Sequence, residues 1–589
     1  MLPVSEVREG MKGYGLTVRK GYAVERFEVE IVGVIRNSSA GRSTIVAALS
    51  GLDLAETGVV AGMSGSPVYL EGKLAGAVSS GWGFAKRTLA GITPFEAMAS
   101  IVPEAPAARR AASSPLPERA AFLARIATLE TEERADALRS ALREMLPPAP
   151  APAAGPGLIS FVASGLPAAT VEAFREPLER LGVREANLAL LGSAAPAAGA
   201  APAEPPTKLS PGDAMTAYLV RGDLNLGATG TVTEVFPDGR FVAFGHPFLG
   251  AGELELPVSK SEVVEVVPSL FQSFKIANGG TPLYRLTNDR DSGVGGRTDR
   301  PAPTVPVTVV VESAGRAPRE MRYDVASSPK LLPILAGLVA DASMNAADPT
   351  PRDRLLSFRV ALDTAAGEVA YADVASGPRA REAAVLSTVA LANAVADNDL
   401  ADPGVKAVTI RFSSAPEERR LRIVDAAPGS RKVAPGDSLA VAVRLADRRG
   451  AESVRVVRMK VPEQAPEGRA TLVVSDGSGA TALRQQLDPS EPKTFAELAA
   501  FVSRIVPGNR LFAGLLVAGR GASTRNATLG ALPPTALALL AGGREQGETG
   551  IADVEGRLVA EEIVPFDRPV SGSVRIDVDI ERARPRGTR

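Results

Sequence analysis

The first hundred residues alternate between apolar and polar positions with the two-residue period of a β-strand, which predicts strands with one buried face. The clearest alternating apolar positions are Phe27, Val29 and Ile31. Two later apolar runs are separated only by Glu71-Gly72, a two-residue connection that predicts a β-hairpin. The pattern therefore predicts a small β domain over residues 1–102.

A second β region is expected over residues 208–315. A strand that begins at Ala228 is followed by the turn Pro237-Asp238-Gly239, and a second strand then runs directly into Gly245-His246. His246 is the only histidine in the chain. The pattern places it at the end of a strand, which is a common position for a functional side chain.

Helical patterns lie between and after these two regions. Residues 103–207 are expected to form a helical insertion with Ala/Pro-rich linkers. Residues 316–415 are expected to form a mixed α/β scaffold, with helices near 330–345 and 380–397.

The remaining residues, 416–589, are expected to form a β-sandwich-like module followed by a terminal α/β accessory region. The alternating apolar positions that predict the sandwich are Leu439, Val441, Val443 and Leu445. Thr494 and Glu497 have the spacing of a capping box, which predicts the start of a helix. The chain is thus predicted to be mainly β with α insertions, a multidomain α+β protein.

Composition limits the functions that this chain can have. Its 66 basic and 67 acidic residues give a net charge of -1, which offers no electrostatic basis for binding nucleic acid. The absence of cysteine excludes disulfides and thiol catalysis, and with a single histidine it argues against a zinc site. We therefore expect no metal and no cofactor. No apolar run is long enough to predict a segment integral to a membrane.

The stretch Gly62-Met63-Ser64-Gly65-Ser66-Pro67 is the strongest candidate for chemistry. A serine hydroxyl becomes a good nucleophile only when a neighbouring base takes its proton, and His246 is the one imidazole available. Small residues let the backbone turn sharply, so the N–H groups of Gly62 and Ser64 could converge on one oxygen as an oxyanion hole. An ordinary β-turn uses the same residue types, and Ser66 is a second possible nucleophile or a residue that shapes the loop.

Two motifs together resemble the SpoIVB-type serine peptidases. The first runs from Thr57-Gly58 to Gly62-Met63-Ser64-Gly65-Ser66-Pro67, and the second leads from Gly230 through the Asp238-Gly239 turn to Gly245-His246. The turn, hairpin and following strand around Ser64 also resemble the nucleophile loop of chymotrypsin-like β-barrel peptidases. The resemblance implies that Ser64 is the nucleophile and His246 the general base, in two β-barrel halves.

The same resemblance implies a protein or peptide substrate, paired with an edge strand at Val78, Ser79 and Ser80. The order of the two motifs departs from the sporulation peptidase, because the serine motif here precedes the histidine motif, and no PDZ domain is evident. The resemblance also implies export to the cell envelope, whereas the first residues lack a signal-peptide pattern and predict a cytoplasmic location if the chain starts there.

The third member of a catalytic triad is left open between two acidic residues. Asp289 is the preferred residue to orient the imidazole, although it could equally cap a turn, and Asp53 is the weaker choice. His246 itself could instead be a hydrogen-bonded core residue. Trp82 and Phe84 are expected either to line a substrate pocket or to belong to the core.

These observations predict a metal-independent serine endopeptidase that acts through an acyl-enzyme on Ser64. The alternative is a non-catalytic binding scaffold, which would capture a protein partner on the barrel edge strand and the C-terminal β module. A third possibility is an enzyme that cleaves only its own Ala/Pro-rich linkers.

Overall fold

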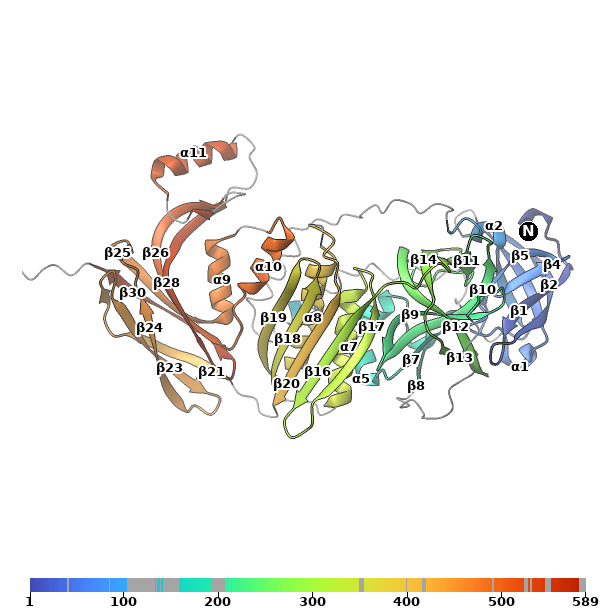
Figure 1. Cartoon of the computed structure of the whole chain (residues 1–589), viewed down its shortest axis with the longest axis horizontal. Helices are drawn as coiled ribbons and strands as arrows, with labels where there is room; N and C mark the ends of the chain where they lie inside the picture. Colours follow the sequence, from blue (N-terminus) through green and yellow to red (C-terminus); the bar gives the residue numbers. More distant parts are fainter. Residues whose placement is uncertain are drawn as a thin grey trace, which may run out of the picture. The chain divides into compact units, whose positions relative to one another are not determined.

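The computed structural model describes most of the chain, drawn in Figure 1 from blue at the N-terminus to red at the C-terminus. The described residues are 1–39, 42–83, 85–102, 133, 135–137, 139–140, 143, 158–191, 207–348, 354–398, 400–415, 420–489, 492–523, 528–529, 532–545 and 552–581. The chain divides into two compact units. The first consists of residues 1–112, 142–307 and 321–342, and the second of residues 113–141, 308–320 and 343–589.

The N-terminal strands of the first unit close into a six-stranded antiparallel barrel in the order β1-β2-β3-β6-β5-β4 (Figure 1). These strands are β1 (Lys12–Val18), β2 (Val24–Ser39), β3 (Arg42–Ser50), β4 (Pro67–Leu70), β5 (Lys73–Gly81) and β6 (Leu89–Pro94). Phe27, Val29 and Ile31 are buried on β2 while the glutamates between them are exposed, which confirms the predicted alternation. Glu71 and Gly72 both have positive φ, as a two-residue hairpin turn requires.

Three short helical turns accompany this barrel. They are η1 (Val4–Glu6), α1 (Leu54–Thr57) and α2 (Phe95–Met98). α1 stands directly before the loop that carries Ser64, and Leu54 anchors it in the barrel core. The barrel thus presents a loop between α1 and β4 whose two ends are both held by packed elements.

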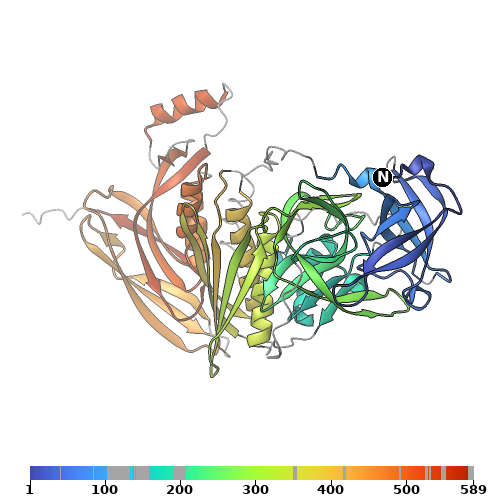
Figure 2. The ribbon, with the colours of Figure 1, turned by 45° about the vertical axis from the view of Figure 1, so that its right-hand side comes forward.

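A second six-stranded antiparallel barrel follows in the same unit, in the order β9-β12-β14-β15-β11-β10, and the pairing of β9 with β10 closes it. Its strands are β9 (Ala214–Gly222), β10 (Asn225–Val235), β11 (Arg240–Ala243), β12 (Gly252–Val267), β14 (Tyr284–Arg290) and β15 (Gly293–Arg297). Figure 2 shows this barrel in green beside the first barrel in blue. The predicted mainly β class with two barrel halves is confirmed.

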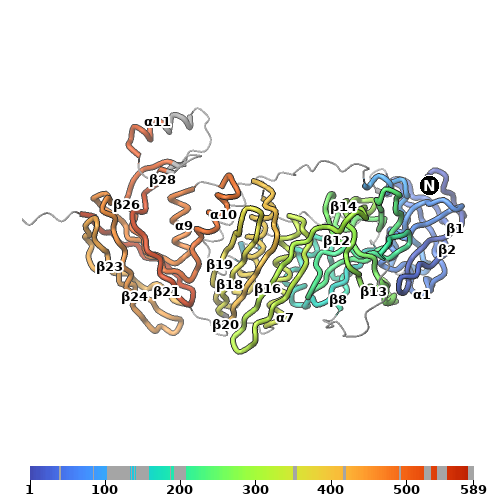
Figure 3. Tube along the Cα trace, viewed as in Figure 1, coloured from blue at the N-terminus to red at the C-terminus, as the bar shows by residue number. Residues whose placement is uncertain are grey.

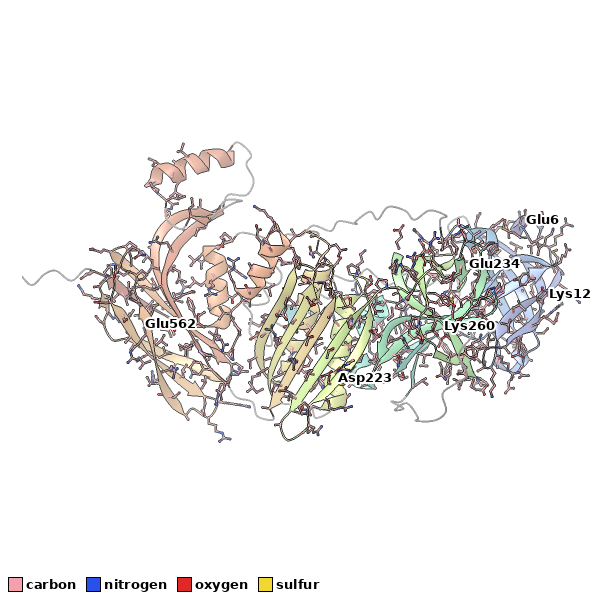
Figure 4. The ribbon with its side chains drawn as sticks, viewed as in Figure 1. Glu6, Lys12, Asp223, Glu234, Lys260 and Glu562 are labelled. Carbon is pink, nitrogen blue, oxygen red and sulfur yellow. The ribbon has the colours of Figure 1, made fainter. Side chains whose placement is uncertain are left out.

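A further strand, β13 (Phe274–Gly279), pairs with β12 and extends from the second barrel to the first. It joins the first barrel through a parallel bridge between Ala61 and Phe274, so that it lies beside the loop of Ser64 (Figure 3). On β12 itself, Lys260, labelled in Figure 4, forms an ion pair of 2.7 Å with the buried Asp213 carboxylate.

The insertion that we expected to be helical contains helices and strands where it is described. Its elements are β7 (Phe161–Ser164), α5 (Ala168–Ala173), α6 (Arg175–Arg180), η2 (Glu185–Asn187) and β8 (Leu188–Leu191). β7 pairs with β10 and β8 pairs with β7, so the insertion extends the sheet of the second barrel. Most of the predicted helical stretch 116–146 lies outside the described residues.

Four elements fall at the limits between the two units or directly after them. They are β16 (Thr304–Ser313), β17 (Arg319–Ala326), α7 (Leu332–Ala347) and β18 (Arg354–Thr364). Within the second unit, β18 pairs with β19 (Gly367–Gly377) and β20 (Ala407–Ala415), and α8 (Ala380–Ala396) packs on β18 and β19. α7 and α8 confirm the two helices expected near 330–345 and 380–397.

The C-terminal part of the second unit consists of two sheets around a common apolar core. The first sheet contains β21 (Leu421–Pro428), β23 (Ser438–Asp447), β24 (Glu452–Lys460) and β29 (Val570–Ser571). The second contains β22 (Lys432–Val433), β25 (Gly468–Asp476), β26 (Arg510–Ser523), β27 (Thr528–Leu529), β28 (Ala552–Pro565) and β30 (Ser573–Ile580). The alternating residues 439, 441, 443 and 445 are buried between them, as the sandwich prediction requires.

Three helices complete this part: α9 (Gly477–Leu487), α10 (Phe495–Ser503) and α11 (Pro534–Glu545). Thr494 is the N-cap of α10 and its hydroxyl accepts a hydrogen bond from the Glu497 N–H, which confirms the predicted helix start. Among the described residues, no helix is both long and apolar enough to cross a membrane.

Candidate active site

Ser64 lies in a tight loop whose backbone is held at both ends. Gly62 has φ +100 and Gly65 has φ +92, left-handed values that a side chain would strain, and the Ser66 N–H closes the turn by donating to the Met63 carbonyl. The Gly65 N–H donates to the Val78 carbonyl at 2.7 Å. The Val78 N–H in turn donates to the Ser66 carbonyl, so the loop is fixed against β5.

The second barrel holds the same loop from its other side. The Thr231 N–H donates to the Ser64 carbonyl at 2.7 Å, and the Thr231 hydroxyl donates to the Gly62 carbonyl at 2.8 Å. The Thr233 hydroxyl donates to the Gly65 carbonyl at 2.7 Å. Each such buried hydrogen bond contributes on the order of 1 kcal/mol to the stability of the fold. Removing the donor also leaves a buried carbonyl group without a hydrogen-bond partner, which destabilises the fold further. β10 therefore fixes three backbone carbonyl groups of the loop, those of Gly62, Ser64 and Gly65.

Gly65 is required by close packing between the barrels as well as by its φ. A Cβ atom at this position would lie 1.9 Å from the Thr231 carbonyl oxygen and 2.4 Å from the Phe244 nitrogen. No side chain fits between these backbone atoms. The backbone of the Ser64 loop is therefore in direct contact with the backbone just before His246.

His246 follows β11 in a segment with unusual backbone geometry. Phe244 and Gly245 both have positive φ, at +68 and +69, which turns the chain sharply out of the strand. The Thr93 hydroxyl donates to the Gly245 carbonyl at 2.6 Å, and a Cβ on Gly245 would lie 3.0 Å from the Val78 carbonyl oxygen. The histidine segment is thus packed on β5 and β6, beside the point where Val78 holds Gly65.

The contacts of the imidazole ring determine its tautomer. Nδ1 lies 2.8 Å from the Pro247 carbonyl oxygen, which can only accept, so Nδ1 carries the proton and Nε2 has a free lone pair. Nε2 is buried and has no hydrogen-bond partner among the described residues. Burial lowers the pKa of His246 below its ordinary value, and the Pro247 carbonyl opposes part of this effect. A neutral ring with a free Nε2 is the form that a general base requires.

Asp289 lies on β14, but its carboxylate holds backbone rather than the imidazole. It accepts hydrogen bonds from the N–H groups of Phe248, Leu249 and Ala251 at 2.7, 2.6 and 3.1 Å. Desolvation raises the pKa of this carboxyl, and the backbone donors oppose the rise. These contacts match the alternative role of Asp289 as a turn cap, although the turn is the one after His246 and not its own.

The two expected oxyanion donors differ in their surroundings. The Gly62 N–H donates to the Leu158 carbonyl oxygen at 3.3 Å, whereas no backbone acceptor is found for the Ser64 N–H among the described residues. Ser64 and His246 are 1% and 6% exposed. The side chains that would react are therefore covered in this conformation.

The comparison with known protein families concerns the part of the chain that carries Ser64. Residues 3–86 match the family described as SpoIVB peptidase S55. The N-terminal part of this chain is an S55 peptidase family domain. The match contains Ser64 and the strands β1 to β5 of the first barrel, and it ends before β6 and before His246. No curated protein and no solved structure matches the chain.

The expected substrate-binding strand of the S55 domain is β5. It is not an edge strand along its whole length, because β4 pairs with it up to Ala77 and β6 pairs with it up to Gly81. Beyond Ala77 the side of β4 has no strand partner among the described residues, and Ser79 forms a bulge whose hydroxyl donates to the Gly91 carbonyl. The open part of β5 is therefore the short segment after Val78.

Four other residues considered from the sequence are Asp53, Trp82, Phe84 and Ser66. Asp53 is exposed, and its carboxylate forms an ion pair of 2.5 Å with Arg19. Trp82 is 39% exposed and is not a core residue. Phe84 lies outside the described residues. The Ser66 Oγ atom is buried and has no hydrogen-bond partner among the described residues.

The sequence reasoning missed Lys275, which lies on β13 beside Gly62 in the loop of Ser64. Its side chain is 2% exposed, and a Cβ on Gly62 would lie 3.0 Å from the Lys275 Cδ atom. Nζ donates to the Thr17 hydroxyl at 2.8 Å. Burial lowers the pKa of Lys275 to about 7. It also lines a cavity of about 340 Å³ behind the loop, together with Met63 and Thr17. Nothing in the local sequence around Lys275 marks it as buried.

Proposed function

We propose that the chain is a serine endopeptidase in which Ser64 is the nucleophile and His246 the general base. The proposal rests above all on one observation: the loop of Ser64 and the segment of His246 pack against each other across two barrels, with Nε2 of the imidazole unprotonated and free. The S55 family match of residues 3–86 supports the same chemistry.

The reaction would proceed through an acyl-enzyme. As Ser64 Oγ bonds to the carbonyl carbon of the substrate, His246 Nε2 takes the hydroxyl proton, and it gives this proton to the departing amine when the C–N bond breaks. Water then attacks the acyl group, with Nε2 again taking a proton and returning it to Ser64. The N–H groups of Gly62 and Ser64 would stabilise the oxyanion in each half, once the Gly62 N–H is released from Leu158.

The imidazolium formed in each step needs a stabilising partner on Nδ1. In this arrangement that partner is the Pro247 carbonyl, and Asp289 acts one step further away by holding the turn that follows it. Asp289 is therefore a positioning residue in the proposal. A direct carboxylate partner for the imidazole would require the turn to open.

The test is labelling of the folded chain with a fluorophosphonate, a probe that reacts rapidly only with an activated serine. We expect one adduct, mapped to Ser64 by peptide mass, that is lost in Ser64→Ala and His246→Ala. Ser66→Ala is the matched control, two residues away in the same loop, and should keep the adduct. Fluorescence of Trp82, the only tryptophan, shows whether each variant is folded.

An adduct on Ser66 instead of Ser64 would contradict the assignment of the nucleophile. If the folded protein carries no adduct under any condition, including after removal of the segment that covers Gly62, the non-catalytic binding scaffold becomes the better account of the chain.

A further inference from the structure

The Gly62 N–H, one of the two proposed oxyanion donors, is occupied by the chain itself. Its partner is the carbonyl of Leu158, which lies 94 residues after Ser64 in the sequence and three residues before the start of β7. Leu158 is 2% exposed, so this hydrogen bond lies in the packed interior of the unit.

The side chain of Leu158 is held by residues on both sides of the nucleophile loop. It belongs to the buried core cluster of the first barrel, together with Val60, Met63 and Val78. A Cβ built on Gly81 would lie 3.0 Å from Val59 and 3.3 Å from the Leu158 Cδ2 atom. The leucine therefore lies between the segment that precedes Ser64 and the open end of β5.

This placement has the features of a substrate residue in a serine peptidase. The residue before the scissile bond puts its carbonyl oxygen on the oxyanion donors, and its side chain enters the pocket that sets specificity. The Leu158 carbonyl accepts from the Gly62 N–H, and the Leu158 side chain packs in the apolar core of the first barrel, next to Gly81 of β5. The burial of Ser64 and His246 also fits a site that is already filled.

We propose that Leu158 is a resident pseudosubstrate of the S55 site. It fills the specificity pocket, and this pocket selects a leucine-like aliphatic residue immediately before the bond to be cut. The inference rests on the proposed function. A protein substrate must displace Leu158 before the Gly62 N–H can serve an oxyanion.

The chain after Leu158 explains how the segment is retained. Phe161 begins β7, which pairs with β10 from Phe161–Ala228 to Ser164–Asn225, and β10 is the strand that clamps the nucleophile loop. The Leu158 contact is a single bond at 3.3 Å, long for an N–H donor, and only one of the two oxyanion donors is engaged. The pairing of β7 with β10 thus holds the segment of Leu158 in place, while its carbonyl accepts too weak a hydrogen bond to be polarised as a substrate carbonyl would be.

The first experiment compares the rate of fluorophosphonate labelling of Ser64 in the wild-type chain and in Leu158→Gly. If Leu158 occupies the site in more than nine-tenths of the molecules, removing its side chain should raise the rate of Ser64 labelling at least about tenfold. Leu166→Gly is the matched control, because Leu166 is a buried leucine of the same insertion that does not belong to the apolar cluster around the loop. It should label at the wild-type rate.

The outcomes separate this inference from the proposed function. Equal labelling of Ser64 in the wild type and in Leu158→Gly would leave the peptidase intact and overturn the pseudosubstrate. Absence of labelling in both folded chains would overturn both proposals. Cleavage of the wild-type chain after Leu158 that is lost in Ser64→Ala would support the inference, since it places the same residue in the pocket.

The second experiment tests the pocket with peptidyl diphenyl phosphonates that differ only in the residue attached to phosphorus. Leu158→Gly should react at least about tenfold faster with the leucine compound than with the lysine or glutamate compounds. A Leu158→Gly, Gly81→Val double variant should lose this preference, because a larger residue at Gly81 fills the place of the leucine side chain. Equal rates with all three compounds in Leu158→Gly would refute the specificity.

Discussion

Lys275→Met is expected to stabilise the first unit near neutral pH, although it removes a buried charge that lies beneath the nucleophile loop. Among the residues that the structure describes, Lys275 has no carboxylate hydrogen-bonded to it, and Nζ donates to the Thr17 hydroxyl. Methionine has a similar length and can keep the packing of the stem against Gly62. The substitution therefore removes an unfavourable charge without opening a large cavity.

The size of the effect follows from the pKa of the ammonium. Burial lowers the pKa of Lys275 from 10.5 to about 7, and each pKa unit corresponds to about 1.4 kcal/mol, so the charged form costs the fold on the order of 5 kcal/mol. Loss of the hydrogen bond to the Thr17 hydroxyl destabilises the variant by about 1 kcal/mol, which offsets part of this gain. The net gain at or below pH 7 is therefore on the order of 4 kcal/mol, or roughly 6–8 °C in the melting midpoint of a unit of this size.

The dependence on pH gives the more specific signature. Between pH 7 and 10.5 the unfolded chain keeps the Lys275 proton while the folded chain has lost it, so the stability of the wild type rises with pH by about 1.4 kcal/mol per unit relative to the variant. The advantage of the variant is thus fully present below pH 7 and disappears as the pH approaches 10.5.

The assay is thermal unfolding followed by Trp82 fluorescence, which reports on the first unit alone because the chain has no other tryptophan. Comparing the two chains at each pH cancels the groups that they share. Lys260→Met is unsuitable as a control because Lys260 is paired, so an exposed lysine, Lys12→Met, serves instead and should change the midpoint little at any pH. A difference between wild type and Lys275→Met that is independent of pH would refute the assignment of a low lysine pKa.

Three further predictions concern the packing and the titration of the site. Gly65→Ala should destabilise the first unit by at least about 3 kcal/mol in the same melting assay, because its Cβ would lie 1.9 Å from the Thr231 carbonyl oxygen; an unchanged midpoint would contradict this packing. Labelling of Ser64 should slow as the pH falls through the lowered pKa of His246, so the midpoint of the pH profile should lie below pH 6.5. A midpoint at or above pH 6.5 would argue against a buried neutral imidazole as the base. Lys260→Met should lower the free energy of unfolding by about 3–5 kcal/mol, because it leaves the buried Asp213 carboxylate without its cation. An added Asp213→Asn should restore most of this loss. Failure to restore it would mean that the lysine stem, and not the ion pair, stabilises β12.

Local patterns in the sequence were sufficient for the strands and several turns, and they single out the two residues that we propose to react. Alternation over Phe27 to Ile31 predicts a half-buried strand because side chains on a strand point to opposite faces, and the two-residue turn at Glu71-Gly72 follows from its length. The hydroxyl of Ser64 and the single imidazole of His246 are recognisable by residue type and motif alone. Such features depend on neighbours within a few residues.

The tertiary structure decided everything that depends on which distant segments meet. The strand β7 within the expected helical insertion, the clamp of β10 on the nucleophile loop and the burial of Lys275 all arise from contacts between residues far apart in the chain. Asp289 is acidic in any reading of the sequence, yet only the folded turn after His246 shows that backbone N–H groups take up its carboxylate.

The same limit applies to the covered state of the site. The sequence by itself determined that the chain has a serine in a glycine-rich turn and a single histidine at a strand end, because motif and residue chemistry are local properties. Only the folded chain placed the Leu158 carbonyl on the Gly62 N–H, because that contact requires two barrels and an insertion to close on one another. A hydrogen bond between such distant residues is set by the packing of whole elements, and no local pattern specifies it.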